Sequence, residues 1–314
     1  MDNKSHLQLP RLFLVAVLCF CMVLPLGAGC TKKPEPKLDP KVGPPVIGEA
    51  GTLRAGVDLA LPPFGGIDGG KQAGIDIDVA SALAERLGLA VTFVDVAPSQ
   101  AATALAEGKV DVVLSVPLTN TDLTRVTPAG TYISDGPGIF GFVADGDSAK
   151  DSNPAEGSDP VEPSMTLETL PVTPIAAQKE SSSYWLVELE YGTAALKPFE
   201  TLREALESVD RAENEVAVGS AVIGAYISRD MKNVQFLGQL APTAPLTVAV
   251  SAENAKLGDA VRLALNELDA DGVLDSIRRK WVGNLPALKG AEPASEPVLG
   301  PDPDASDPTL AAEE

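Results

Sequence analysis

Histidine and cysteine are scarce in this chain, which has one histidine and three cysteines among 314 residues. His6, Cys19 and Cys21 lie in an N-terminal segment that we expect to be removed, which leaves Cys30 alone. That scarcity excludes a disulfide within the remaining chain, a Ser-His-Asp triad, a cysteine nucleophile, and a zinc site built from histidine or cysteine. Function must then come from carboxylates, hydroxyls, Lys, Arg and backbone groups.

Basic residues are also outnumbered, with 24 Lys and Arg against 44 Asp and Glu, for a formal net charge of -20. Such an acidic surface repels phosphate backbones, so we predict no nucleic-acid partner. The sequence also lacks a Walker motif and a dinucleotide-binding loop. These absences direct attention to small-molecule binding.

The N-terminal segment has the pattern of a secretory signal, because Lys4 and Arg11 precede an apolar run over residues 12–26. That run is shorter than the roughly 20 residues needed to span a bilayer, which disfavours an uncleaved anchor. The following "GAGC" resembles the lipobox of bacterial lipoproteins, although Gly27 stands where leucine is usual. We therefore predict a lipoprotein, acylated on Cys30 and held on the outer side of a bacterial membrane; ordinary secretion is the alternative.

Three stretches rich in proline and polar residues interrupt the chain. We predict that residues 1–29 are the signal peptide and that residues 30–50, which are rich in proline and charged residues, form an extended tether. Residues 286–314 predict a disordered acidic tail. Residues 144–171 predict an inserted loop beside a hinge, because so long a loop inside one compact domain is unusual.

Between these stretches, strand and helix signals alternate. "VDVVLSV" is a continuous apolar run of the kind that forms a strand buried on both faces. In "DVASALAERLG", Val79, Leu83 and Leu87 recur at helical spacing and share one face. Residues 255–283 predict two helices broken near Gly272. The alternation predicts an α/β fold with a mostly parallel sheet.

The order of these segments resembles the solute-binding proteins of bacterial ABC importers that bind polar amino acids. The resemblance covers roughly residues 51–285 and is carried by "LRAGVDLALPPFG", "GIDIDVASALAERLG", "ALAEGKVDVVLS", "AVGSAVIGAY" and "LNELDADGVLDSIRRKWVG". It implies a type II periplasmic-binding-protein-like fold, in which two α/β lobes joined by two hinge strands close over a ligand. Lobe 1 would comprise residues 51–143 and 245–285, and lobe 2 residues 172–244.

The resemblance implies a monomeric binding protein rather than an enzyme. Such a protein needs no cofactor, binds a small polar, amino-acid-like ligand, and delivers it to ABC permease subunits. Two alternatives remain open. The chain would otherwise be a non-transporting ligand-sensing receptor module or degenerate family member, or, less favoured, a dehydratase-type enzyme with Glu180 as a buried acid or base.

In lobe 1, the resemblance places ligand contacts on residues after two strands. Asp58 stands where the family has an aspartate near the ligand, and Phe64 either lines the cleft or packs behind the turn. Ser115 and Thr119 are candidate hydrogen-bond donors to the ligand. Arg125 is the candidate carboxylate clamp, because bidentate guanidinium contacts suit carboxylates. An ungapped count puts Leu123 at the family's arginine position, so Arg125 reaches the ligand only if the loop is rearranged.

In lobe 2, the resemblance implies hydroxyl residues at a helix start, a place that suits anions. Ser181 and Ser182 keep those hydroxyls, whereas Glu180 stands where the family has glycine. Ser220 stands where the family has its ammonium-binding aspartate, and a serine cannot neutralise an amine. The usual amino-acid clamp is therefore weakened at both ends.

Other polar residues receive structural interpretations. Asp76 and Asp78 flank a helix start, so we expect their side-chain oxygens to cap its first amides, with no metal bound. Asp135 and Glu215 are interpreted as ordinary loop or strand-end charges. Tyr184 and Trp185 are candidates for a wall of the cleft, although at least one of them should pack into the lobe.

Overall fold

The computed structural model describes residues 39–117, 124–143, 165–171, 174–286, 288 and 290. The predicted signal peptide, Cys30 and Thr119 lie outside the described residues, as do most of the 144–171 insertion and of the 286–314 tail. The predicted α/β architecture is confirmed, with two five-stranded sheets and a short hairpin of β2 (Gly66–Asp68) and β3 (Lys71–Ala73).

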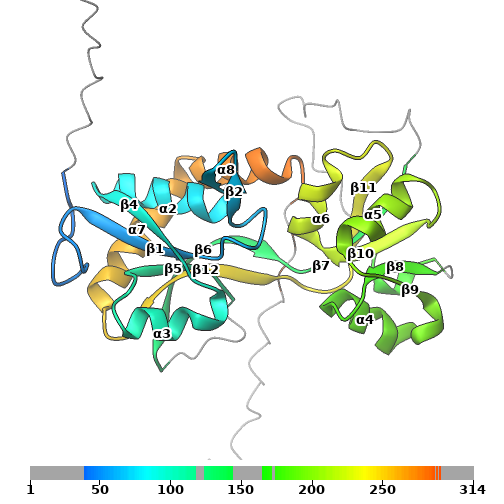
Figure 1. The fold of residues 1–314 in the computed structure, drawn as a ribbon, viewed down its shortest axis with the longest axis horizontal. Coiled ribbons are helices and arrows are strands. Elements are labelled where there is room, and N and C mark those ends of the chain that lie inside the picture. The colour runs from blue at the N-terminus through cyan, green and yellow to red at the C-terminus, as the bar shows by residue number, and fades with distance from the viewer. Residues whose placement is uncertain are drawn as a thin grey trace, which may run out of the picture. The chain divides into compact units, whose positions relative to one another are not determined.

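The first sheet has the strand order β4-β1-β5-β12-β6 (Figure 1). The strand β1 pairs in parallel with β4 and β5, whereas β12 runs antiparallel to β5 and β6. The long helices α2 and α7 pack on each other, and α8 contacts both of them. The elements are β1 (Thr52–Val57), α2 (Ile75–Arg86), β4 (Ala90–Asp95), η1 (Pro98–Gln100), α3 (Ala101–Ala106), β5 (Val112–Pro117), β6 (Val126–Asp135), β12 (Ala244–Ser251), α7 (Ala255–Ala270) and α8 (Val273–Val282).

The second sheet has the order β11-β7-β10-β8-β9. Here β8 pairs in parallel with β9 and β10, and β7 runs antiparallel to β10 and β11. The helices α4, α5 and α6 pack on it. The elements are β7 (Pro137–Phe142), η3 (Leu167–Thr169), β8 (Ile175–Gln178), α4 (Ser182–Tyr191), η4 (Thr193–Ala195), β9 (Leu196–Phe199), α5 (Leu202–Asp210), β10 (Val216–Ser220), α6 (Ala221–Ser228) and β11 (Val234–Gln239).

The chain crosses between the sheets twice. It leaves the first sheet at Asp135, passes Gly136, and enters the second at Pro137, earlier than the expected exit near residue 143. It returns at Ala244, which pairs with Asp135, beside the expected return at 245. Gly136 lets the two crossing segments approach closely, because a Cβ there would lie 3.0 Å from the Cα of Thr243 on the returning segment. Because β12 runs antiparallel to its neighbours in the first sheet, and β7 does so in the second, both sheets are mixed rather than mostly parallel.

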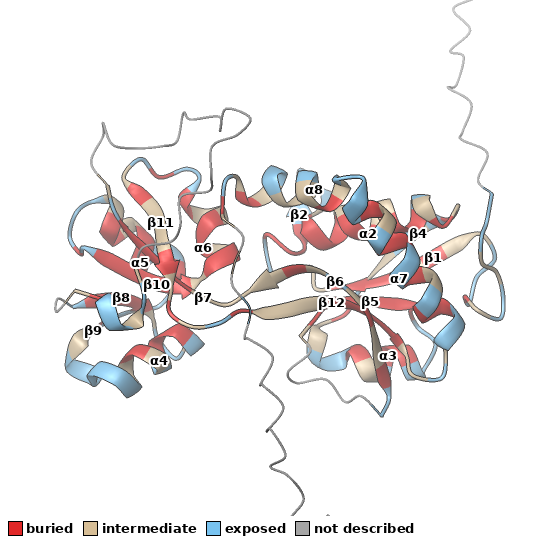
Figure 2. Cartoon of the chain, turned by 180° about the vertical axis from the view of Figure 1, so that it is seen from behind, coloured by how far each residue is buried: buried red, intermediate tan, exposed pale blue. Residues whose placement is uncertain are grey.

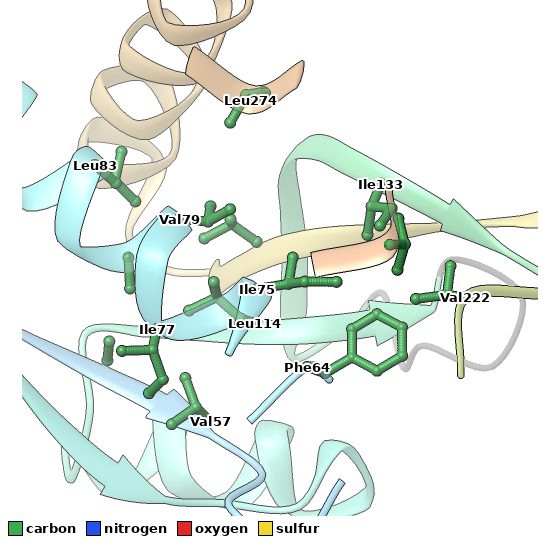
Figure 3. Close-up of a cluster of buried hydrophobic side chains, with 14 of the residues drawn as sticks. Val57, Phe64, Ile75, Ile77, Val79, Leu83, Leu114, Ile133, Val222 and Leu274 are labelled. Atoms are coloured by element: carbon green, nitrogen blue, oxygen red, sulfur yellow. The ribbon is translucent and has the colours of Figure 1, made fainter. Parts of the chain in front are cut away.

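The apolar patterns of the sequence become the core. The strand β5 is buried along nearly its whole length, as its continuous apolar run predicts. Val79, Leu83 and Leu87 are all buried, and Figure 2 colours much of α2 as buried. Val79 and Leu83 lie in the apolar cluster of Figure 3. The last two helices separate at Gly272, whose φ of 71° is left-handed, a conformation that glycine adopts at little cost. These predictions are confirmed.

Candidate functional site

The candidate site lies at the carboxyl ends of the parallel strands, where open α/β sheets bind ligands. We call the residues that follow β1 and β5 the first carboxyl edge, and those that follow β8 and β10 the second carboxyl edge. In the first sheet, Pro117 of β5 pairs with Leu246, two residues after the Ala244–Asp135 pair. In the second, Ser220 ends β10 opposite Pro137. Both edges therefore adjoin the same crossing of the chain.

Asp58 directly follows β1 at the first carboxyl edge. Its Oδ1 accepts a hydrogen bond from the Ala60 amide at 2.9 Å, and no described residue donates to its Oδ2. The negative charge of Asp58 contributes to raising the pKa of Asp76, so the two carboxylates lie close together. Asp58 thus keeps an unpaired carboxylate oxygen at the position that the resemblance assigns to the ligand.

Ser115 is committed to a buried network behind this edge. Its hydroxyl donates to Asp76 Oδ2 at 2.7 Å, and its amide donates to the Tyr132 hydroxyl at 2.8 Å. Tyr132 in turn donates to Asp76 Oδ1 at 2.5 Å. Ser115 is 5% exposed and holds a left-handed φ of 55°. The structure therefore uses the Ser115 hydroxyl to support Asp76.

Burial dominates the electrostatics of this network. Asp76 is 0% exposed, and burial raises its pKa from 3.8 to about 7, against the opposing effect of the hydrogen bonds from Tyr132 and Ser115. Burial and the neighbouring Asp76 charge together raise the pKa of the Tyr132 hydroxyl well above its ordinary value. The network is a buried acid with two hydroxyl partners.

The capping role predicted for Asp76 and Asp78 is wrong. The N-cap of α2 is Gly74, and no side chain caps that helix. Asp76 is instead turned inward to Ser115 and Tyr132, while Asp78 Oδ2 accepts hydrogen bonds from Lys280 Nζ at 2.6 Å and Trp281 Nε1 at 2.7 Å. Both carboxylates join elements far apart in the sequence, which a local helix-start pattern cannot reveal.

The second carboxyl edge begins with Glu180, which follows β8. Its φ of 60° lies in the left-handed region, where a side chain costs about 1 kcal/mol more than glycine. Glu180 is exposed, and no described residue bonds to its carboxylate. The next residue, Ser181, is the N-cap of α4 and accepts from the Tyr184 amide at 3.1 Å, whereas Ser182 is exposed.

Ser220 caps α6 and is joined to Asp135. Its Oγ accepts from the Ile223 amide at 3.0 Å and donates to Asp135 Oδ2 at 2.7 Å. The other oxygen of Asp135 accepts from the Val222 amide at 3.0 Å. Burial raises the pKa of Asp135, and these donors oppose that effect. Asp135 does end a strand, β6, but the interpretation of it as an ordinary charge is wrong, because its partners come from β10 and α6, 85 or more residues later.

The sequence profile of bacterial extracellular solute-binding proteins, family 3, matches residues 53–284, which include strands of both sheets and both carboxyl edges. The chain belongs to this family. A search of curated proteins finds no match.

Solved structures share the fold of this family 3 solute-binding protein. An ancestral cationic amino acid solute-binding protein is 26% identical, with a TM-score of 0.59, over 74% of this chain and 96% of that one. The L-cystine solute receptor of Neisseria gonorrhoeae, unliganded and open, is 22% identical, with a TM-score of 0.59, over 76% and 95%. A polar amino acid ABC uptake transporter substrate binding protein from Streptococcus thermophilus is 17% identical, with a TM-score of 0.61, over 75% and 88%. The two-lobed, type II periplasmic-binding fold is thereby confirmed.

Arg125 of this solute-binding protein lies away from both carboxyl edges. It precedes β6, its carbonyl accepts from the Ala252 amide at 3.0 Å, and its side chain is exposed. Because β6 has 10 residues, Arg125 lies about 30 Å from the Asp135 end of that strand. The structure does not bring this guanidinium to any predicted ligand residue that it describes.

Aromatic residues of this solute-binding protein divide between packing and exposure. Phe64 is 2% exposed and belongs to the apolar cluster that holds Ile133 and Val222, so it packs behind the turn (Figure 3). Tyr184 is buried in the second lobe, as expected for one of the pair, while Trp185 is 52% exposed one turn into α4. That exposed indole lies close to the second carboxyl edge and stays a candidate for the cleft wall.

The described surface also carries a shallow groove between α2 and α8, lined by Asp78, Ser81, Ala82, Glu85, Val273, Ser276, Ile277 and Lys280. It includes none of the predicted ligand residues.

The described residues hold no group of three or more His, Cys, Asp and Glu placed for a metal. None of the helices in the described part of the chain has the length and apolar character needed to cross a bilayer.

Proposed function

We propose that this protein is the extracytoplasmic solute-binding component of an ABC importer, binding one small polar ligand between its two carboxyl edges. The observation that carries the proposal is the family match, which runs through both lobes and the crossing between them. Ligand contacts from both edges would favour the closed arrangement, since only a differential interaction shifts a conformational equilibrium. Asp58 on one side, and Ser181, Ser182 and Ser220 on the other, are the proposed ligand contacts. Phe64 and Ser115 are buried and would support the first carboxyl edge from behind.

A thermal-shift screen tests ligand binding directly, because a ligand that binds only the native state raises its melting temperature. We expect at least one compound in a panel of amino acids, amines and organic acids to raise Tm in proportion to the logarithm of its concentration. If no compound in the panel shifts Tm, binding of a small polar ligand is refuted.

We also propose that the protein is a lipoprotein anchored through Cys30, with residues 1–29 as its signal peptide. The predicted tether of residues 30–50 is wrong for residues 39–50, which pack on the first lobe: Ile47 is 1% exposed, and the Val46 carbonyl accepts from Asn254 Nδ2 at 2.8 Å. We propose that the tether ends before residue 39. Acyl chains would hold it at a membrane surface without a spanning helix. Cys30→Ser should move the protein from the membrane fraction to the soluble fraction and abolish labelling by an alkyne fatty acid, whereas Cys21→Ser should change neither. Retained labelling of Cys30→Ser would contradict the anchor.

A sensing role without transport is the second candidate. It is favoured by the departures from the family's clamp, namely Ser220 in place of aspartate and Arg125 at the far end of β6. Deleting the gene should abolish uptake of the identified ligand if the protein serves transport, and leave uptake unchanged if it serves sensing. The dehydratase alternative requires a buried carboxylate at Glu180, and Glu180 is exposed.

A further inference from the structure

The charged side chains at the two carboxyl edges indicate which class of ligand the protein binds. This inference rests on the proposed function. An amino-acid carboxylate needs a cationic partner, which the resemblance supplies as an arginine after β5. Residues 118–123, with the sequence "LTNTDL", contain no basic residue. Arg125 is the next candidate, and it lies at the far end of β6 with its carbonyl bonded to the Ala252 amide. Within the described part of the chain, the first carboxyl edge therefore offers no guanidinium to a ligand carboxylate.

Carboxylates, by contrast, stand at both edges. Asp58 keeps an oxygen without a donor among the described residues. Glu180 is exposed and free of ion pairs within the described part of the chain. Asp135 lies 2.7 Å from the Ser220 hydroxyl, and so places a carboxylate beside the residue that replaces the family's ammonium-binding aspartate. Asp135, at the end of β6, thus supplies a carboxylate next to Ser220, where the resemblance implies an aspartate.

Glu180 is a notable member of this set because its backbone conformation favours glycine. Its φ is 60°, and the resemblance implies a glycine at this position. Left-handed non-glycine residues concentrate at functional sites. Ala212 is a matched residue outside the site, with φ 56° in the turn that follows α5, where its amide donates to the Val209 carbonyl at 2.8 Å. The pair allows backbone strain to be separated from charge.

Lys179 is the one basic residue among the three sequence positions that follow each of β1, β5, β8 and β10. Its amide continues the ladder to the Phe199 carbonyl at 2.9 Å, and its side chain is exposed. A lone flexible ammonium next to Glu180 lacks the bidentate geometry of a guanidinium clamp.

We propose that the ligand is a small organic cation, an amine or guanidinium compound, held by carboxylates at both edges and bound without recognition of an α-carboxylate. An α-carboxylate on the ligand would meet Asp58 and Glu180 with no guanidinium to offset them. An amino acid is therefore a poorer ligand than the amine that its decarboxylation leaves.

Calorimetric titration of the full-length protein, extracted in detergent, with two matched pairs tests this: agmatine against arginine, and cadaverine against lysine. We expect the Kd of at least one amine to be at least tenfold lower than that of its parent amino acid. Tighter binding of arginine or lysine than of its amine overturns the proposal. If none of the four binds while another solute raises Tm, the cation class is wrong and the binding function stands; if no solute binds at all, the proposed function itself fails.

Variants at Glu180 and Ala212 test whether the Glu180 carboxylate holds the ligand. Glu180→Gly should weaken binding of the amine at least tenfold without lowering Tm, because glycine suits that φ, and Glu180→Gln should weaken binding similarly. Ala212→Gly relieves the same conformation outside the site and should leave Kd unchanged. Unchanged affinity in Glu180→Gly removes Glu180 from the ligand site. A tenfold loss of amino-acid affinity in Lys179→Gln would instead identify Lys179 as a carboxylate clamp and overturn the proposal.

Discussion

The carboxylate of Asp135 accepts a hydrogen bond from the Ser220 hydroxyl at 2.7 Å, which joins the last residue of β6 in the first sheet to the residue that caps α6 in the second. The same carboxylate accepts from the Val222 amide. A single side chain at the crossing therefore fixes the start of a helix in the other lobe. This arrangement makes the crossing a structural link as well as a boundary of the candidate site.

The Asp135–Ser220 link predicts a measurable coupling. Ser220→Ala removes the cap and should cost about 1 kcal/mol, and Asp135→Ala removes acceptors for two donors and should cost about 1–3 kcal/mol. Because the side chains are direct partners, the double variant should lose about 1 kcal/mol less than the sum of the single losses. Urea unfolding of all four proteins measures this coupling, and strictly additive losses would show that the hydrogen bond contributes nothing.

Asp76 predicts an unusual pH dependence of stability. Its pKa rises from 3.8 to about 7 on folding, so between these values the native protein binds a proton that the unfolded chain releases. The free energy of unfolding should therefore fall as pH rises from about 4 to about 7, by up to about 1.4 kcal/mol per pH unit. Asp76→Asn cannot titrate and should lack this contribution. Urea unfolding at pH 4.5, 5.5 and 6.5 tests it, and parallel pH profiles for the two proteins would contradict the assignment.

Tyr132→Phe provides the accompanying control. The Tyr132 hydroxyl donates to Asp76 and so favours the charged carboxylate, which lowers the Asp76 pKa. Removing that donor should move the pH-dependent loss of stability to higher pH. A shift to lower pH would show that the tyrosine does not act as the donor.

The sequence predicts those features of the fold that depend on local pattern. The helix break at Gly272 and the buried strand β5 follow from spacing and composition alone. Asp76 and Asp135 could not be interpreted in the same way, because their partners are 39 to 87 residues away along the chain. A helix-start pattern shows that a carboxylate is present and cannot show which way it turns. The unusual residue at Glu180 was visible in the sequence, whereas its left-handed φ required the structure.

The buried Asp111 should carry much of the stability of the first lobe. Its Oδ1 accepts from the Gly48 amide at 2.8 Å and Arg54 Nη2 at 2.7 Å, and its Oδ2 accepts from the Arg54 amide and Nε. Asp111→Ala leaves the partly buried Arg54 guanidinium without its carboxylate partner, and the Gly48 and Arg54 amides without an acceptor. We therefore expect a loss of about 3–5 kcal/mol in the free energy of unfolding. Lys109→Ala breaks an exposed ion pair to Glu107 nearby and should cost less than about 1 kcal/mol. Comparable losses in both variants would contradict the central role of Asp111.

Asp78 links α2 to α8 through a charged and a neutral donor, and their contributions can be separated. Lys280→Met removes an exposed ammonium, whose ion pair should contribute about 0–1 kcal/mol. Asp78→Ala also leaves the Trp281 indole without its acceptor, so we expect a loss of about 1–2 kcal/mol. In a Trp185→Phe background the chain has one tryptophan, and its emission should shift to longer wavelength in Asp78→Ala but not in Lys280→Met. If the lysine variant loses as much stability as the aspartate variant, the ion pair and not the indole hydrogen bond holds the two helices together.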